Sequence, residues 1–298
     1  MQNAIEDMLP LLACPESGRP LRLDNGELVA AERRYRVEAG FPILLRPSGG
    51  ASTAAAVRDA FRSRSGSYFA DNYVDAQNPE RARRQGRIRT MLEGLVSSDS
   101  VVLEAGAGPA VLAEALEPMA GAYLALDLSI DNLLAARDRI GQFTGVVGDL
   151  TALPFANEAF DGAVAIGCLE YVGEVETAVA ELCRVTKPGG FVLMTFANAH
   201  SPRRWWDEAV THRLSRLRRR RTRAVYRRRL TSRMAAMRMV ERADTFVESL
   251  EPLNPGLLGY PLSSSLRIQR AEEALARRFA PARLSASELI VLGRKRSA

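Results

Sequence analysis

The sequence predicts a doubly wound α/β fold built on a mostly parallel sheet of seven strands. From about residue 100, short runs of apolar residues alternate with helical segments, and each run is apolar almost throughout. Such runs are typical of strands covered on both faces, as in a parallel sheet flanked by helices. Ligands of this architecture bind at the carboxyl ends of the strands, so we expect the functional residues there.

The predicted elements follow one another closely along the chain. The expected strands are VVLEA (101–105), AYLALDLS (122–129), FTGVVGDL (143–150), FDGAVAIG (160–167), GGFVLMTFA (189–197), TFVESL (245–250) and ELIVLGR (288–294). The expected helices lie at 79–95, 109–118, 130–140, 174–186, within 213–243 and around 263–279. The turn KPGG, residues 187–190, is expected to introduce the fifth strand, because proline followed by glycines suits a type II turn.

Bulk properties limit the class of protein. With 298 residues, 47% of them hydrophobic, the chain can bury a large core. No apolar stretch approaches the roughly 20 residues that span a bilayer, and Glu6 and Asp7 stand where a secretory signal needs a basic start, so we expect a cytoplasmic protein. Cys14, Cys168 and Cys183 are too few and too widely spaced for a disulfide framework or a cysteine-rich zinc site.

The turn after the first strand, in VVLEAGAGPA (101–110), indicates a ligand. Gly106 and Gly108 let the backbone turn sharply and approach a ligand, and the next helix is expected to offer free amide groups. The dinucleotide pattern G-x-G-x-x-G fits poorly, because Val111 takes the third glycine position. Glu104, just before the glycines, would repel a pyrophosphate. The turn therefore favours a cofactor that carries a cationic amino group.

Two aspartates extend this prediction to a nucleoside. Asp127 ends the second strand a little over twenty residues after the glycine turn, where a carboxylate can accept hydrogen bonds from both ribose hydroxyls. Asp149 follows the third strand and could accept from an exocyclic amine, with Leu150 against the face of a purine. Together with Glu104, these carboxylates would hold one ligand at three places.

In order and spacing, these segments together with GDLTALPFANEAFDGAVAIGCLEYV and RVTKPGGFVLMTFAN resemble the motifs of class I S-adenosylmethionine-dependent methyltransferases, in particular the quinone-biosynthesis-like group that acts mostly on small molecules. The resemblance covers about residues 98–198 and implies a Rossmann-like methyltransferase fold, S-adenosylmethionine as cofactor and no metal. It implies a set of cofactor-binding residues: Glu104, Gly106, Ala107 and Gly108 at the methionine end, Asp127 and Leu128 at the ribose, Asp149 and Leu150 at the adenine, and Gly167 and Cys168 beside the methyl donor. Ala110 replaces a glycine that is frequent in the family, and we expect this to cost little because alanine still permits close packing.

The first 47 residues are expected to form a small β-rich module. They resemble the zinc-ribbon-like domain that accompanies many methyltransferases, but only Cys14 remains, Ser17 takes the second ligand position and no cysteine stands near Tyr35. A structural zinc needs four ligands, so we expect a metal-free module. Its expected core is Leu12, Leu21, Leu23, Val37, Phe41, Ile43 and Leu44.

The remaining segments are assigned by their position. Residues 48–97 are expected to form a linker and a helical lid, in which Tyr68 and Tyr73 either cover the cofactor or belong to the core of the entry helix. Residues 98–298 would form the S-adenosylmethionine-binding domain, with an insertion at about 200–280 that recognises the substrate. A homo-oligomer is compatible with the sequence.

Three residues are candidates for catalysis, and one nearby residue is not. His200 follows the fifth strand directly, where a general base could deprotonate a substrate. Glu170 and Tyr171, just after the fourth strand, could face the substrate equally well. Proximity and alignment alone can support methyl transfer, so the reaction does not require a base. We expect Cys168 to pack as a small apolar residue rather than to react.

Arginines are dense between residues 203 and 234, and their role stays open. They could form a solvated helix face, bind an anionic or amphipathic small substrate or a membrane surface, or contact nucleic acid phosphates. The favoured function is methyl transfer to a small-molecule acceptor, plausibly in specialised metabolism. One alternative is an RNA or ribosome-associated methyltransferase that uses segment 213–229. Another is a catalytically silent binding or scaffold subunit that keeps the fold.

Overall fold

The structure is a computed structural model that describes residues 2–31, 33–46, 79–141, 143–206, 229–254, 266–278 and 286–297. Three of the predicted features fall outside these ranges. They are residues 48–78 of the linker and lid, which include Tyr68 and Tyr73, most of the arginine-rich segment 213–229, and residues 207–228, 255–265 and 279–280 of the proposed insertion.

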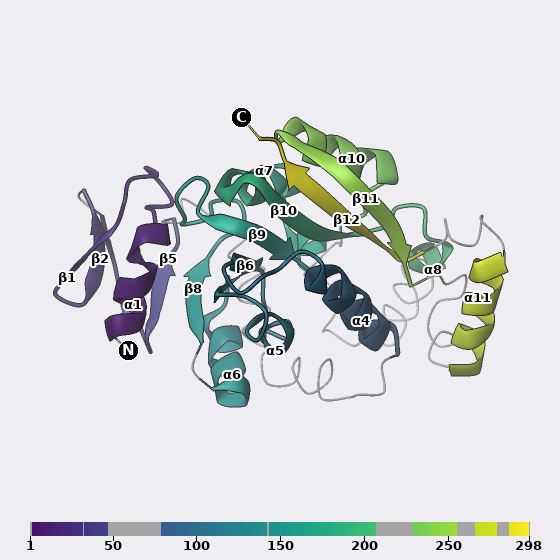
Figure 1. The fold of residues 1–298 in the computed structure, drawn as a ribbon, viewed down its shortest axis with the longest axis horizontal. Coiled ribbons are helices and arrows are strands. Elements are labelled where there is room, and N and C mark those ends of the chain that lie inside the picture. The colour runs from purple at the N-terminus through teal and green to yellow at the C-terminus, as the bar shows by residue number, and fades with distance from the viewer. Residues whose placement is uncertain are drawn as a thin grey trace, which may run out of the picture.

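A twisted sheet of nine strands forms the centre of the molecule, in the order β11-β12-β10-β9-β6-β7-β8-β5-β4 (Figure 1). The seven predicted strands are consecutive in this sheet: β6 (Val101–Ala105), β7 (Ala122–Asp127), β8 (Thr144–Gly148), β9 (Phe160–Ala165), β10 (Thr186–Ala197), β11 (Thr245–Leu253) and β12 (Glu288–Lys295). Strands β6 to β10 pair in parallel, while β12 is antiparallel to both β10 and β11. The predicted doubly wound α/β fold is therefore confirmed.

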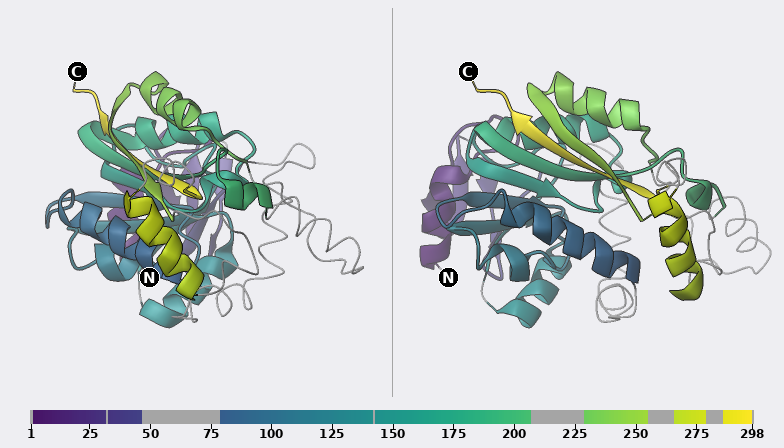
Figure 2. Two further views of the ribbon diagram at one scale, coloured as in Figure 1. Left: turned by 90° about the vertical axis from the view of Figure 1, so that its right-hand side faces the viewer. Right: turned by 45° about the vertical axis from the view of Figure 1, so that its right-hand side comes forward.

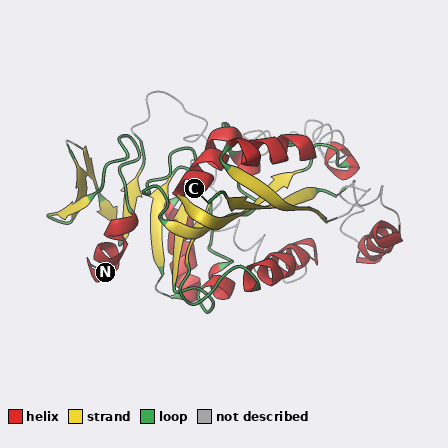
Figure 3. Cartoon of the chain, turned by 45° about the horizontal axis from the view of Figure 1, so that its top comes forward, coloured by secondary structure: helices red, strands yellow, loops and turns green. Residues whose placement is uncertain are grey.

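Helices cover the two faces of the sheet and enclose separate apolar cores (Figures 1 and 3). On one face lie α4 (Pro79–Glu93), α5 (Ala113–Leu116) and α6 (Ile130–Ile140), whose buried side chains pack with Val102 and Leu193. On the other lie α7 (Val175–Val185) and α10 (Arg233–Arg242), which pack with Leu103 and Val192. Successive strand residues thus enter opposite cores, which explains why the strands are apolar throughout.

The N-terminal segment is built onto the edge of this sheet. It contains α1 (Gln2–Met8), a three-stranded antiparallel sheet of β1 (Arg22–Asp24), β2 (Glu27–Ala30) and β3 (Arg33–Tyr35), and the hairpin β4 (Val37–Glu38) and β5 (Phe41–Leu44). Strand β5 runs parallel to β8, so this segment adds two strands to the predicted seven. A second link is the backbone bond from Ala13 N–H to the carbonyl of Pro154, at 2.9 Å. Of the predicted core, Leu12, Leu21, Phe41 and Leu44 are buried.

Three predicted boundaries differ from the structure. The helix expected at 109–118 is a single turn, α5, because the chain is still turning up to residue 112. The KPGG residues lie within β10, where the register with β9 shifts between Thr186 and Phe191. In the described part of 213–243, the helix begins only at Arg233, after Ser232, whose hydroxyl oxygen accepts a bond from the Ala235 N–H at 3.2 Å.

At the far side of the molecule lie α8 (Pro202–Trp206) and α11 (Leu266–Arg278) (Figure 2). Both elements are found beyond the carboxyl ends of the parallel strands, away from the N-terminal segment. In the described part of the chain, no helix combines the length and the apolar character that a membrane crossing requires.

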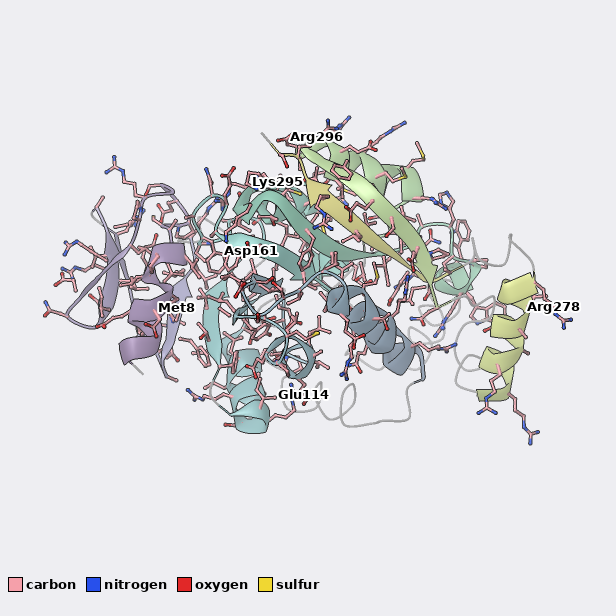
Figure 4. The ribbon with its side chains drawn as sticks, in the orientation of Figure 1. Met8, Glu114, Asp161, Arg278, Lys295 and Arg296 are labelled. Atoms are coloured by element: carbon pink, nitrogen blue, oxygen red, sulfur yellow. The ribbon has the colours of Figure 1, made fainter. Side chains whose placement is uncertain are left out.

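The amino ends of the parallel strands are fixed by ionic and polar contacts (Figure 4). Asp161, near the start of β9, accepts hydrogen bonds from the Val101 N–H at 2.8 Å and from Lys187 Nζ at 2.9 Å. Lys295 Nζ donates to the carbonyl of Thr186 at 2.9 Å. This edge has a structural role, and the functional candidates lie at the opposite edge.

Candidate functional site

The predicted glycine turn connects β6 to α5 at the carboxyl edge of the sheet. The amides of Gly106 and Ala107 both donate to the carbonyl of Leu126 in β7, at 2.8 and 2.9 Å, and the Gly108 amide donates to Asp127 Oδ2 at 2.7 Å. These bonds tie the turn to the neighbouring strand. The amides at 106–108 are thus used inside the protein.

The two glycines of the turn are required for different reasons. Both have positive φ values, 71° at Gly106 and 56° at Gly108, which disfavour other residues. A Cβ atom at Gly106 would lie 2.6 Å from the Cβ of Cys168, so the position is also closed by packing. At Gly108 a Cβ would meet nothing within 4 Å, so this part of the turn faces open space that a ligand can use.

At Ala110 the backbone conformation, rather than the packing, sets the cost of replacing glycine. Its φ value is 50°, and its side chain is fully buried. The departure from glycine at this position therefore costs free energy through the left-handed backbone conformation, by about 1–2 kcal/mol in general. Arg139 in α6 stabilises this conformation, because its Nη2 donates to the carbonyl oxygens of Pro109 and Ala110 at 3.0 and 2.9 Å.

Glu104 is a buried acid in the middle of the site. Its side chain belongs to β6, and Oε2 accepts a short hydrogen bond of 2.5 Å from the hydroxyl of Tyr123 in β7. Burial raises the pKa of Glu104 from its ordinary value of 4.5 to about 8, an effect that the Tyr123 bond opposes and the nearby Asp127 charge reinforces. At neutral pH the free protein holds this carboxyl largely protonated, and a cation beside it would favour its ionised form.

Asp127 ends β7 and is held in a fixed orientation. Oδ1 accepts bonds from the Ser129 N–H at 2.9 Å and from Asn132 Nδ2 at 3.0 Å, in addition to the bond from Gly108 to Oδ2. Burial raises the pKa of Asp127, while these three donors oppose the shift. A carboxylate offers about four acceptor positions, so Asp127 keeps capacity for a hydroxyl donor of a ligand.

The residues predicted for the base end of the ligand follow β8. Asp149 Oδ1 accepts from the backbone N–H and the hydroxyl of Thr151, both at 2.9 Å, so one of its oxygens organises the local turn. Leu150 is buried and lies against the glycine turn, with Cδ1 3.5 Å from the Cβ position of Gly106. Leu128 is half-buried beside Asp127. The structure thus places Leu150 against the glycine turn, and Leu128 and Asp149 directly after the neighbouring strands β7 and β8.

Gly167 and Cys168 follow β9 at the same edge. The Gly167 N–H donates to Thr195 Oγ1 at 2.7 Å, and the Cys168 thiol lies 3.4 Å from the carbonyl of Ala105. Burial raises the pKa of the Cys168 thiol, and the charges of Asp127 and other nearby acids add to this effect. A protonated thiol is a poor nucleophile, in agreement with a packing role for Cys168.

The three catalytic candidates occupy different surroundings. His200 is exposed after β10, and its backbone N–H donates to Asn198 Oδ1 at 3.0 Å. Glu170 and Tyr171 belong to a short 3₁₀ turn, Leu169–Tyr171, directly after Cys168. Glu170 lies 3.4 Å from Arg204, which places it in an ion pair. All three stay predictions, and Tyr73 lies outside the described residues.

The structure adds charged residues that sequence reasoning missed. Arg84 of α4 lies 3.2 Å from Glu288 Oε1, and Arg204 of α8 lies 3.4 Å from Glu170 Oε2 and 3.8 Å from Glu288 Oε1. The four side chains are only 11 to 16% exposed. We call Arg84, Glu170, Arg204 and Glu288 the ion-pair cluster. Glu170 was already a candidate by its position after the fourth strand, but no pattern in the sequence links it to Arg84, Arg204 or Glu288.

In the N-terminal segment, the remaining cysteine has a protein partner. The Sγ of Cys14 is buried and lies 3.1 Å from the hydroxyl of Tyr35. Within the described ranges, His, Cys, Asp and Glu residues form no group of three or more that could hold a metal. The resemblance of this segment to a zinc-ribbon-like domain stays a prediction.

A protein-family model matches the strands at the centre of the sheet. Residues 103–194 match the family model of the methyltransferase domain. The matched region runs from β6 to β10 and includes the glycine turn, Asp127 and Gly167. The predicted class I methyltransferase fold and the family match therefore agree over the same part of the chain.

Curated relatives resemble this domain but are longer than the matched region. The chain is 36% identical over 94 residues to a malonyl-[acyl-carrier protein] O-methyltransferase of Salmonella typhimurium, covering 32% of this chain and 38% of that protein. It is 34% identical over 116 residues to a demethylmenaquinone methyltransferase of Renibacterium salmoninarum, covering 39% of this chain and 48% of that protein. The matches thus span less than half the length of these relatives.

Solved structures share the fold at low sequence identity. A chain from the complex between the Haloferax volcanii Trm112 methyltransferase activator and a methyltransferase has a TM-score of 0.58 and 16% identity, covering 81% of this chain and 98% of that chain. A magnesium protoporphyrin IX methyltransferase of Synechocystis PCC 6803, solved with bound S-adenosylhomocysteine, has a TM-score of 0.56 and 14% identity, covering 82% of this chain and 100% of that chain. Both support a Rossmann-like methyltransferase fold that extends beyond the matched domain.

Proposed function

We propose that this chain is an S-adenosylmethionine-dependent methyltransferase that acts on a small-molecule acceptor. The observation that carries the proposal is the meeting of Glu104, Gly108 and Asp127 at one turn inside a methyltransferase domain. This turn combines two buried carboxylates with an open approach at Gly108. Such a site suits a ligand with a cation at one end and a ribose at the other.

The residues present fit this cofactor. Glu104 would accept the methionine ammonium group, because its carboxyl is buried and only the Tyr123 hydroxyl donates to it among the described residues. Asp127 would accept ribose hydroxyls with its remaining capacity, and Leu150 would lie against the adenine. Gly167 and Cys168 would border the sulfonium end. These roles were predicted from the sequence and are consistent with the positions of the side chains.

When bound, the cofactor supplies an electrophilic methyl group, whose bond to sulfur breaks as a bond to the acceptor's nucleophilic atom forms. The chain's part is to hold the two reactants close and in line, and to keep water away from them. Glu170, Tyr171 and His200 are the candidates to take up a proton from the acceptor. Of these, Glu170 is held in place by its ion pair with Arg204, at 3.4 Å.

The acceptor class is supported by the names of the curated relatives, which are methyltransferases of an acyl-carrier-bound malonyl group and of a quinone precursor. We infer a small acceptor, plausibly of specialised metabolism, that binds between the cofactor and residues 200–280. An RNA acceptor gains no support, since the described end of segment 213–229 is Arg229, whose side chain pairs with Glu176 at 2.9 Å.

Calorimetric titration with S-adenosylhomocysteine tests the proposal directly. We expect binding to the wild type, loss of binding in Asp127→Ala and weaker binding in Glu104→Ala. Asp99→Ala, outside the site, serves as the control and should bind like the wild type. Absence of binding to a folded wild type would reject the enzyme and favour a scaffold subunit that keeps the fold.

A further inference from the structure

The two carboxylate oxygens of Glu288 have different surroundings. Oε1 lies close to the guanidinium groups of Arg84 and Arg204. Oε2 is shielded from solvent, and within the described part of the chain no donor reaches it. Leaving a buried acceptor unpaired costs about 1–3 kcal/mol, and more if it is charged. This oxygen is therefore suited to receive a donor from outside the protein.

The charges in the ion-pair cluster decide which kind of ligand fits. Two arginines face two glutamates, so the cluster has no formal net charge, and Arg204 Nε also donates to the carbonyl of Ser287 at 2.8 Å. An anionic ligand without a hydrogen-bond donor cannot bond to Oε2, which only accepts, and would meet the formal negative charge of Glu288. A donor group would find Oε2 free while every ion pair remains.

The position of the cluster relates it to methyl transfer. Arg84 Nη1, which contacts Glu288, lies 3.3 Å from the point that a Cβ atom would occupy if Gly167 had a side chain. Gly167 is one of the residues that would border the methyl donor under the proposed function. A single guanidinium group therefore separates Glu288 from the place of transfer, a spacing that a small acceptor can span.

We propose that Glu288 forms an acceptor subsite whose Oε2 binds a hydroxyl or ammonium group of the methyl acceptor. The proposal rests on the proposed function, because only a bound cofactor makes this position part of a transfer site. Arg84 and Arg204 would hold the Glu288 carboxylate in a fixed orientation. The subsite selects acceptors that carry a hydrogen-bond donor and disfavours those whose only polar group is a carboxylate.

Three probes that share a benzene ring test this selection: benzylamine, benzyl alcohol and benzoate. Each is titrated by ligand-observed NMR against the full chain saturated with S-adenosylhomocysteine. We expect benzylamine and benzyl alcohol to bind at least tenfold more tightly than benzoate. In Glu288→Gln, whose carboxamide can present N–H groups in place of Oε2, benzylamine should lose at least tenfold in affinity, and its preference over benzoate should disappear.

Glu248→Gln is the matched control. Glu248 lies on β11 and pairs with Arg294 on β12, at the other end of these strands from Glu288. It should leave all three affinities unchanged. If Glu288→Gln does not fold, Glu288→Asp gives an independent measurement, because it withdraws the carboxylate by one methylene and should weaken benzylamine binding. Benzoate binding best to the wild type, or an unchanged order in both site variants, would overturn the proposal. S-adenosylhomocysteine affinity, measured separately, reports on the proposed function alone.

Discussion

Replacing Glu104 by glutamine should change how the stability of the protein depends on pH. Burial raises the pKa of Glu104 from 4.5 to about 8, so the folded chain holds a proton that the unfolded chain releases at lower pH. The stabilising contribution of the protonated form is complete below about pH 4.5 and is lost as the pH rises to about 8. In this window one proton changes the free energy of unfolding by about 1.4 kcal/mol per pH unit.

The same proton should affect cofactor binding in the opposite direction. The ammonium group of S-adenosylhomocysteine favours the ionised carboxylate, so binding requires release of the proton. The affinity of the wild type should rise by about tenfold per pH unit from pH 6 toward pH 8 and then level off. Glu104→Gln has no proton to release, and its affinity should vary much less with pH and fall below that of the wild type at pH 9.

Calorimetry between pH 6 and 9 measures both the affinity and the protons released, if the titrations are repeated in buffers of different ionisation enthalpy. Urea unfolding at the same pH values gives the stability slope. Glu93→Gln is a matched control, since Glu93 is exposed and pairs only with Arg89 across one helical turn. An affinity of the wild type that is flat between pH 6 and 8, or equal slopes in wild type and Glu104→Gln, would refute the reasoning.

Three further predictions concern the turn and the N-terminal segment. Arg139→Met removes the donors to the glycine turn and should lower stability by about 1–3 kcal/mol in urea unfolding; it should also weaken S-adenosylhomocysteine binding, and unchanged affinity would contradict a role in shaping the turn. Gly106→Ala should lower the free energy of unfolding by at least about 2 kcal/mol, and adding Cys168→Gly should restore part of this stability. If the double variant regains no stability, the contact with Cys168 is not the cause. Gly108→Ala should mainly weaken S-adenosylhomocysteine binding. Leu12→Ala should cost about 2–5 kcal/mol within one thermal transition by calorimetry, and a separate early transition would show that the N-terminal segment unfolds on its own.

The fold could be predicted because its signals are local. Each central strand is an apolar run of five or six residues, and its burial on both faces leaves a pattern that needs no knowledge of the neighbours. The ends of elements were less predictable. Helix α5 is short because the backbone reaches positive φ at Gly108 and Ala110, and the alanine gave no sign of this in the sequence.

The candidate site divides in the same way. Glu104, the glycine turn and Asp127 stand within or directly after strands, so their meeting at one edge follows from the parallel order alone. The hydrogen bonding and the pKa of Glu104 do not follow from this order. The bond from Tyr123 and the raised pKa of Glu104 depend on which strand lies beside β6 and on how completely the helices exclude water.

By itself, then, the sequence determined the parallel sheet, the edge at which we propose that a ligand binds and the carboxylates that lie there, because these depend on spacing along one stretch of chain. Tertiary structure decided the rest. It joined the N-terminal hairpin to β8 and brought Arg84, Arg204 and Glu288 together from three distant segments. The physical reason is that ion pairs and strand edges are matched across space, where distance along the sequence carries no information.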